Sequence, residues 1–73
     1  MLYAYLGLFV GFAEDGRALV RYLFNGEIHS LNAEDSGEIP PCTPLGAQVM
    51  LDGNGNAPRL RRLLLEAREV AHV

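Results

Sequence analysis

Residues 3–31 read YAYLGLFVGFAEDGRALVRYLFNGEIHSL, and two dipeptides divide this stretch into three apolar segments. Asp15-Gly16 and Asn25-Gly26 lie between β-favouring residues, which is typical of two-residue hairpin loops whose central positions need a positive φ angle. The sequence therefore predicts a three-stranded antiparallel meander. Its strands are expected over residues 3–13, 17–24 and 27–31.

Two-residue loops would fix the register of both hairpins. The expected pairs are Glu14 with Arg17, Phe12 with Leu19 and Phe9 with Tyr22 in the first hairpin, and Leu23 with Ile28 and Tyr22 with His29 in the second. These pairs are chemically compatible, because opposite charges face each other and apolar side chains face apolar ones.

The meander has two apolar faces, because successive side chains of a strand point to opposite sides of a sheet. An aliphatic face, which we expect to form the core, contains Leu6, Leu8, Val10, Phe12, Leu19, Leu23 and Ile28. An aromatic face contains Tyr3, Tyr5, Phe9, Val20, Tyr22, Phe24 and His29, with Gly7 and Gly11 between the rings. The aromatic face must be covered by the rest of the chain, as in a small five-stranded barrel, or remain available to a partner.

The second half of the chain begins with a long connection, residues 32–46, which contains three prolines, three acids and no hydrophobic periodicity. Connections of this length are often functional or mobile, and a barrel crossover stiffened by proline is the alternative. Residues 47–52 are expected to form a fourth strand, with Val49 and Leu51 on one side.

The tail from Ala57 has two possible structures. Its leucines and alanines recur at helical spacing and Pro58 suits a first turn, which favours a C-terminal helix. A turn over residues 52–56 could equally return a fifth strand over 59–66, which would help to cover the aromatic face. The predicted fold is therefore mainly β, a small antiparallel meander or five-stranded barrel, with or without one C-terminal α-helix.

The composition indicates one globular domain over residues 1–73. Hydrophobic residues make up 49% of the chain and charged residues 21%, which is normal for a folded domain. The uncharged run over residues 1–13 is too short to span a bilayer and lacks the features of a secretory signal. A single cysteine, Cys42, allows no intrachain disulfide. We therefore expect a cytoplasmic protein without a membrane segment.

The charge of the chain argues against nucleic acid as a direct partner. The net charge is -3, and the chain contains six arginines but no lysine. Binding to a phosphate backbone requires a broad cationic surface, which this composition does not provide. Arg59, Arg61 and Arg62 lie close together in the tail, and arginine is enriched at protein-binding sites because its planar fork pairs with carboxylates.

No residue pattern indicates catalysis or metal binding. The stretch over 52–56 resembles the start of a calcium loop, but Ala57 and Leu63 replace the required Gly and Glu. His29, His72 and Cys42 lack zinc-site spacing. Ser30 and His29 point to opposite faces of their strand, so they do not pair directly. We expect a non-enzymatic protein that needs no cofactor and no metal.

Three resemblances give this protein a functional context. The segment Gly7-Leu8-Phe9-Val10-Gly11-Phe12 resembles the glycine-aromatic motif of cold-shock proteins, without its basic residue, which implies a single-stranded nucleic-acid-binding barrel. Segments 9–12, 15–20, 46–49 and 53–54 look like small β-barrel modules of phage and bacterial secretion-spike proteins, which implies a structural role. Those modules normally sit inside longer proteins, whereas we interpret this chain, which begins with Met1, as a complete product.

The whole chain also resembles, in size and acidic character, the small inhibitors that bacteriophages produce against host RNA polymerase. This resemblance implies binding to polymerase subunits, in the host cytoplasm, with inhibition or modulation of transcription. We expect a protein-binding regulator, with bacterial RNA polymerase as its partner, and the structural module and the nucleic-acid-binding barrel as alternatives. The expected contact residues are Tyr3, Tyr5, Phe9, Tyr22, Arg59, Arg61 and Arg62.

Overall fold

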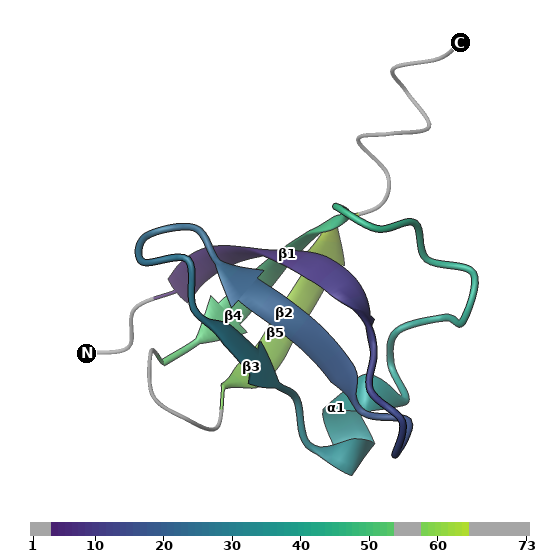
Figure 1. Cartoon of the computed structure of the whole chain (residues 1–73). Helices are drawn as coiled ribbons and strands as arrows, with labels where there is room; N and C mark the ends of the chain where they lie inside the picture. Colours follow the sequence, from purple (N-terminus) through teal and green to yellow (C-terminus); the bar gives the residue numbers. More distant parts are fainter. Residues whose placement is uncertain (1–3, 54–57, 65–73) are drawn as a thin grey trace, which may run out of the picture.

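The computed structural model describes residues 4–53 and 58–64 and shows one five-stranded antiparallel sheet (Figure 1). The strand order is β3-β2-β1-β4-β5. The elements are β1 (Ala4–Phe12), β2 (Ala18–Tyr22), β3 (Ile28–Ser30), α1 (Ala33–Ser36), β4 (Gln48–Asp52) and β5 (Arg59–Leu64). The prediction of a mainly β fold is confirmed.

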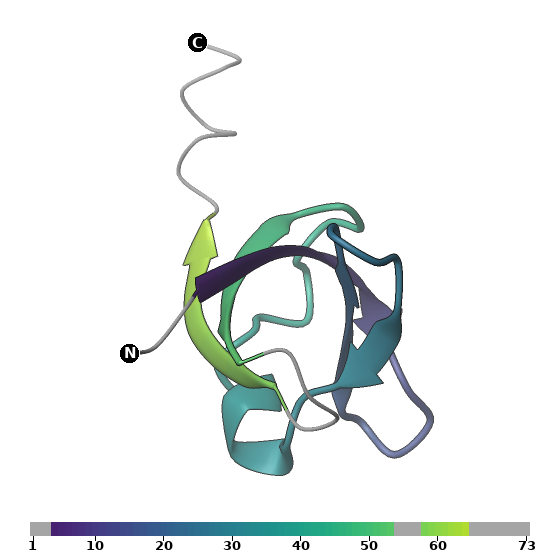
Figure 2. The same cartoon turned by 90° about the vertical axis from the view of Figure 1, so that its left-hand side faces the viewer.

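The sheet curves around its core but does not close. Figure 2 shows the strands bending around a common interior, with β5 on one side and β3 on the other. Within the described residues, β3 pairs only with β2 and β5 only with β4, so the two edges do not form a ladder with each other. The five-stranded barrel, one of the two predicted architectures, is therefore not formed, and the protein is an open, curved antiparallel sheet.

The tail forms a strand where helical spacing favoured a helix. Leu60 pairs with Leu51 and Leu63 pairs with Val49, although residues three apart point to opposite faces of a regular strand. A bulge resolves this conflict, because Arg61 is an extra residue in the register between β4 and β5. The bulge turns both leucines to the same face, so a spacing that indicates a helix also fits a bulged strand. Residues 65–73 of the predicted helix lie outside the described part.

Both hairpin loops are longer than predicted. The Ala13 N–H donates to the Arg17 carbonyl over 2.8 Å, which leaves three residues in the first loop, and Gly16 adopts a φ of 89° there. The Tyr22 N–H donates to the Glu27 carbonyl over 2.9 Å, which leaves four residues in the second. The glycine turns are confirmed, but the predicted register is wrong.

The observed pairs differ accordingly from the expected ones. Phe9 pairs with Val20, Gly7 pairs with Tyr22, and a bulge at residue 10 shifts the register of β1 against β2. In the second hairpin Val20 pairs with His29 and Arg21 with Ile28. Each added loop residue or bulge moves a partner along its strand, and these shifts decide which side chains meet.

The core forms on the aromatic face and not on the aliphatic face. Its buried apolar residues are Phe9, Ala18, Val20, Tyr22, Leu31, Ile39, Ala47, Val49 and Leu51. The prediction that the aliphatic face forms the core is wrong, because Leu6, Leu8, Val10 and Leu19 are only partly buried and Phe12, Leu23 and Ile28 are exposed. The centre of the aromatic face, Phe9, Val20 and Tyr22, is covered by the rest of the chain, whereas Phe24 is 55% exposed.

Gly7 helps to explain why this face is the concave one. A Cβ atom on Gly7 would lie 3.0 Å from the Leu51 side chain and 3.0 Å from the Arg21 carbonyl oxygen. The absence of a side chain therefore lets β1 approach β4 and β2 closely opposite Tyr22, whose ring is fully buried. The Tyr22 hydroxyl donates to the Gly53 carbonyl over 2.8 Å, which satisfies its polar end.

The long connection contains a short helix that the sequence analysis missed. Asn32 caps α1, since its side-chain oxygen accepts from the Asp35 N–H over 2.7 Å. Ser36 at the end of α1 accepts from the Ala18 N–H of β2 over 2.8 Å, and Asp35 accepts from the Leu60 N–H of β5 over 3.0 Å. The helix thus joins the two sides of the open sheet.

Candidate protein-binding surface

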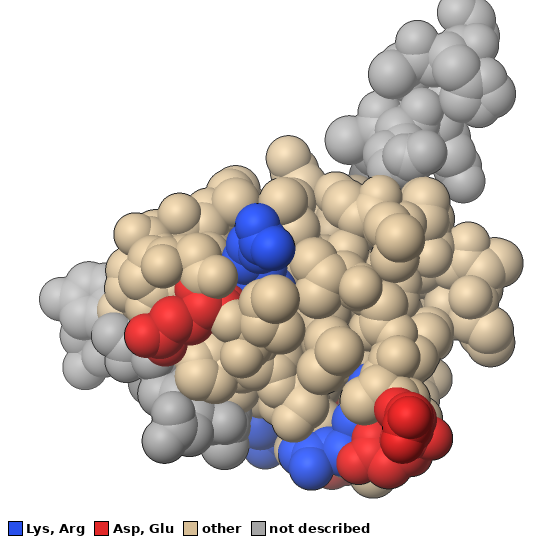
Figure 3. All heavy atoms as spheres, viewed as in Figure 1, with Lys and Arg blue, Asp and Glu red and all other residues tan. Residues whose placement is uncertain are grey.

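A group of exposed and partly exposed apolar side chains lies on the convex side of the first three strands. We call it the outer face and define it by Leu6, Leu8, Leu19, Arg21, Leu23 and Ile28. Leu23 is 50% exposed and Ile28 is 49% exposed, while the other leucines are partly buried. Figure 3 views this side and shows uncharged surface over most of β1 and β2, interrupted by cationic atoms beside an acidic patch. Large exposed apolar surface of this kind is typical of interaction sites.

Arg21 occupies the centre of the outer face. It lies directly opposite Leu8 of β1 and directly opposite Ile28 of β3. Leu19 precedes it by two positions and Leu23 follows it by two, and the Leu23 N–H donates to the Leu6 carbonyl over 3.1 Å. Arg21 therefore has aliphatic residues as neighbours along its own strand and on both adjacent strands.

The predicted aromatic contact residues lie away from this surface. Phe9 and Tyr22 are 1% and 0% exposed, so they belong to the core and are not available to a partner. Tyr5 is partly buried and packs edge-on against Tyr22, with ring centroids 6.0 Å apart. Tyr3 lies outside the described residues. Phe9 and Tyr22 are therefore not available to stack with nucleic-acid bases.

The three predicted arginines lie on β5 and are exposed. Arg59 donates to Asp35, with 2.8 Å between Nε and Oδ2, and Arg61 Nε lies 3.0 Å from Asp52 Oδ1. Arg62 lies opposite Met50 and forms no ion pair within the described residues. The structure brings these side chains together along one edge strand, but two of the three are committed to acids of the same chain.

A groove of about 400 Å³ lies between α1 and β5. It is lined by Glu34, Asp35, Glu38, Leu60, Arg61, Arg62 and Leu63. Acids of α1 and the following turn face arginines of β5 across it, with two leucines between them. The groove therefore has one acidic wall and one basic wall.

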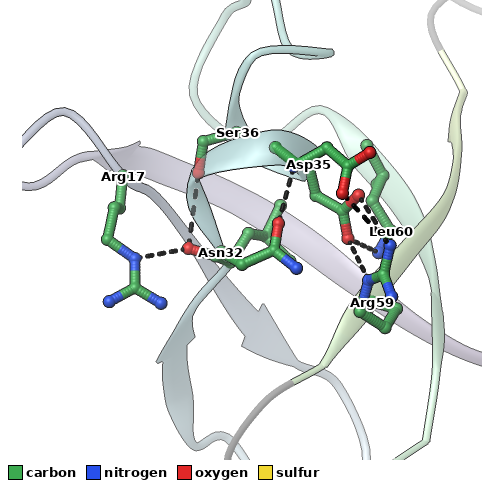
Figure 4. A network of polar contacts seen from close by, with 8 residues as sticks. Arg17, Asn32, Asp35, Ser36, Arg59 and Leu60 are labelled. Atoms are coloured by element: carbon green, nitrogen blue, oxygen red, sulfur yellow. Dashed lines mark hydrogen bonds and ion pairs between the residues drawn. The ribbon is translucent and has the colours of Figure 1, made fainter.

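Asp35 is the most constrained acid of this groove (Figure 4). Its carboxylate, 9% exposed, accepts from Arg59 Nε and from the Leu60 N–H. The hydrogen bond from Arg59 lowers the pKa of Asp35, burial opposes this shift, and the Leu60 N–H lowers the pKa further. A carboxylate held in its charged form by two donors is poorly suited to act as a base, so its role is to fasten α1 to β5.

A second group of polar contacts fastens α1 to the first hairpin. Arg17 Nε donates to the Leu31 carbonyl over 2.8 Å, and the Ser36 hydroxyl donates to the same oxygen over 3.4 Å (Figure 4). The Ser36 oxygen also accepts from Ala18. Each of these groups completes the hydrogen bonding of buried backbone, which explains them structurally.

Within residues 4–53 and 58–64, no cluster of three or more His, Cys, Asp or Glu side chains could hold a metal ion. His29 contacts Glu27, with 3.0 Å between Nε2 and Oε1, and Cys42 is exposed. His72 lies outside the described residues. The same part of the chain contains no helix long and apolar enough to cross a membrane.

Comparisons of the chain with protein-family models, with curated proteins and with solved structures found no match.

Sequence reasoning missed the outer face although a signal for it is present. Residues 19, 21 and 23 alternate along β2 and its end, so Arg21 belongs to the same face as Leu19 and Leu23. An arginine is almost never fully buried without a partner. A central arginine therefore indicates that the aliphatic face is the exposed one and the aromatic face the core.

Proposed function

We propose that the protein is a non-enzymatic, protein-binding regulator and that the outer face is its contact surface. The observation that carries this proposal is the group of aliphatic side chains on the strands around Arg21, of which Leu23 and Ile28 are about half exposed among the described residues. Fully burying a Leu or Ile side chain stabilises by roughly 1.5–3 kcal/mol, so covering the half-exposed Leu23 and Ile28 would contribute about half of that for each.

Bacterial RNA polymerase is the partner that we propose. The choice rests on the resemblance in length and acidic character to small phage inhibitors of that enzyme. Binding through an apolar face suits such a role, because an inhibitor of this kind acts by occupying a protein surface. The expected consequence is blocked initiation or altered termination of transcription.

Affinity capture from a bacterial lysate tests this proposal. The baits are the wild-type protein, the outer-face variant Leu23→Ser/Ile28→Thr, and the control Leu45→Ser. Leu45 is 74% exposed and lies in the 32–46 connection, so its variant removes exposed apolar surface from another place. We expect polymerase subunits with the wild type and the control, and much less with the outer-face variant. Failure of the wild type to retain any polymerase subunit would overturn the choice of partner.

A structural module of a phage or secretion-spike assembly is the second candidate, and the outer face supports it in a different way. If copies of the chain cover each other's outer faces, the protein forms a defined homo-oligomer. Sedimentation equilibrium separates the two functions, because a regulator of polymerase is expected to remain monomeric at micromolar concentration. An oligomer that Leu23→Ser/Ile28→Thr dissociates would favour the structural module.

A further inference from the structure

We infer that Arg21 recognises a carboxylate on the partner protein, and that the partner segment is an Asp or Glu flanked by apolar residues. This inference rests on the proposed function, because it assigns a chemistry to the occupant of the outer face. Its basis is the position of one cation at the centre of an aliphatic surface.

Several acids of the described residues contact basic side chains other than Arg21. Glu27, which precedes β3, contacts His29 Nε2 over 3.0 Å. Asp35 and Asp52 pair with Arg59 and Arg61 on β5. Within the described residues, no acid lies within ion-pair distance of Arg21.

A partner that covers the leucines must also cover Arg21, because Leu8 and Ile28 lie on either side of it. Covering the guanidinium removes it from water, which is strongly unfavourable unless the partner supplies hydrogen-bond acceptors. A carboxylate is the best match, since it accepts two parallel hydrogen bonds from the planar fork and neutralises the charge.

The surroundings of Arg21 select the rest of the partner segment. The four neighbouring positions in the sheet, two across the strands and two along β2, are aliphatic, and they favour apolar residues on both sides of the acid. A nucleic-acid phosphate would satisfy Arg21 equally well, but its neighbouring groups are polar and anionic. Those groups would meet leucines and a chain of net charge -3. The surface therefore fits an acidic and apolar protein segment.

Zero-length cross-linking provides a direct test, because the chain contains no lysine. The substitution Arg21→Lys introduces the only side-chain amine. A carbodiimide then joins this amine to a carboxylate in contact with it by an amide bond, with loss of water to the reagent. Arg62→Lys is the matched control, because Arg62 is exposed on β5, which β1 and β4 separate from β2. The probe is purified bacterial RNA polymerase.

We expect Arg21→Lys to form a cross-link to an Asp or Glu of polymerase that has apolar neighbours, and Arg62→Lys to form little. We also expect Arg21→Gln to weaken binding to polymerase by at least about tenfold, since truncation of one partner of a buried charge pair has effects of this size or larger. Wild-type affinity of Arg21→Gln, or a cross-link from Arg62→Lys without one from Arg21→Lys, would overturn the inference and leave the proposed function intact. If wild-type protein does not bind polymerase at all, both fail.

Discussion

The inner and outer faces of β1 and β2 are built from alternating residues of the same two strands, and both are apolar. The inner face carries Phe9, Val20 and Tyr22 and is fully buried beneath the loop and strands of the second half. The outer face carries leucines around Arg21 and is left open to solvent. Hydrophobicity alone therefore does not decide which face forms the core. The two faces differ in the close approach of β1 to its neighbouring strands at Gly7, on the inner face, and in the charged Arg21 on the outer face.

The largest expected effect is on the inner face. Phe9→Ala removes a ring that is 1% exposed, and large-to-small changes of this kind destabilise by about 3–5 kcal/mol. Small domains are stable by only about 5–15 kcal/mol, so much of the folding free energy should be lost. Urea unfolding followed by circular dichroism measures it. A loss below about 1 kcal/mol would contradict the assignment of Phe9 to the core.

Gly7 offers a sharper test of the curvature of the sheet. Gly7→Val should destabilise by about 1–3 kcal/mol, because its Cβ would press against the Arg21 carbonyl and the Leu51 side chain. The control is Gly37→Ala, where φ is -67° and an added Cβ meets its nearest atom at 3.4 Å. Urea midpoints of the two variants should differ clearly. Equal midpoints would show that β1 does not depend on this close approach.

A substitution of Asp35 tests the contact that holds α1 against β5. Asp35→Asn should destabilise at neutral pH by about 1–3 kcal/mol, because charge-assisted hydrogen bonds to Arg59 and Leu60 are weakened. The pKa of Asp35 is lowered in the folded protein, so its contribution is fully present above the unfolded pKa of about 3.9 and is lost as the pH falls through the folded pKa. The stability difference between wild type and Asp35→Asn should therefore shrink below about pH 4. A difference that is independent of pH would contradict the ion pair.

The smallest effect on stability is expected on the outer face. Leu23→Ser/Ile28→Thr should change the free energy of unfolding by less than about 1 kcal/mol, because both side chains are half exposed. The same variant should lose most of its binding to polymerase. Urea unfolding and affinity capture on one preparation check both halves of this prediction. A destabilisation similar to that of Phe9→Ala would place these residues in the core and break the comparison.

Much of the fold could be predicted from the sequence, because the relevant signals are local. Asp15-Gly16 and Asn25-Gly26 mark both hairpin turns, and four strands lie within the ranges predicted for them. The register could not be predicted, since three- and four-residue loops use the same dipeptides as two-residue loops. The fifth strand could not be separated from a helix, because the bulge at Arg61 gives Leu60 and Leu63 a spacing that suits both structures.

The candidate site was harder to predict than the fold. Its residues belong to three strands that come together in the folded sheet, and they were predicted to form the core and not the exposed face. Phe9 and Tyr22 are aromatic residues, a type that is common at binding sites, but the second half of the chain covers them. The position of Arg21 between Leu19 and Leu23 was available in the sequence, and it indicates the correct face.

The two isoleucines of the chain provide the most direct test of the outer face. Ile28 lies on the outer face and is 49% exposed, whereas Ile39 lies in the core and is 3% exposed. Protein labelled at the isoleucine methyl groups should give one signal that a soluble paramagnetic agent broadens strongly, from Ile28, and one that it spares, from Ile39. When bacterial RNA polymerase is added, we expect the Ile28 signal to become protected from the agent and the Ile39 signal to stay unchanged. Broadening of Ile28 that is the same in the complex as in the free protein would contradict it.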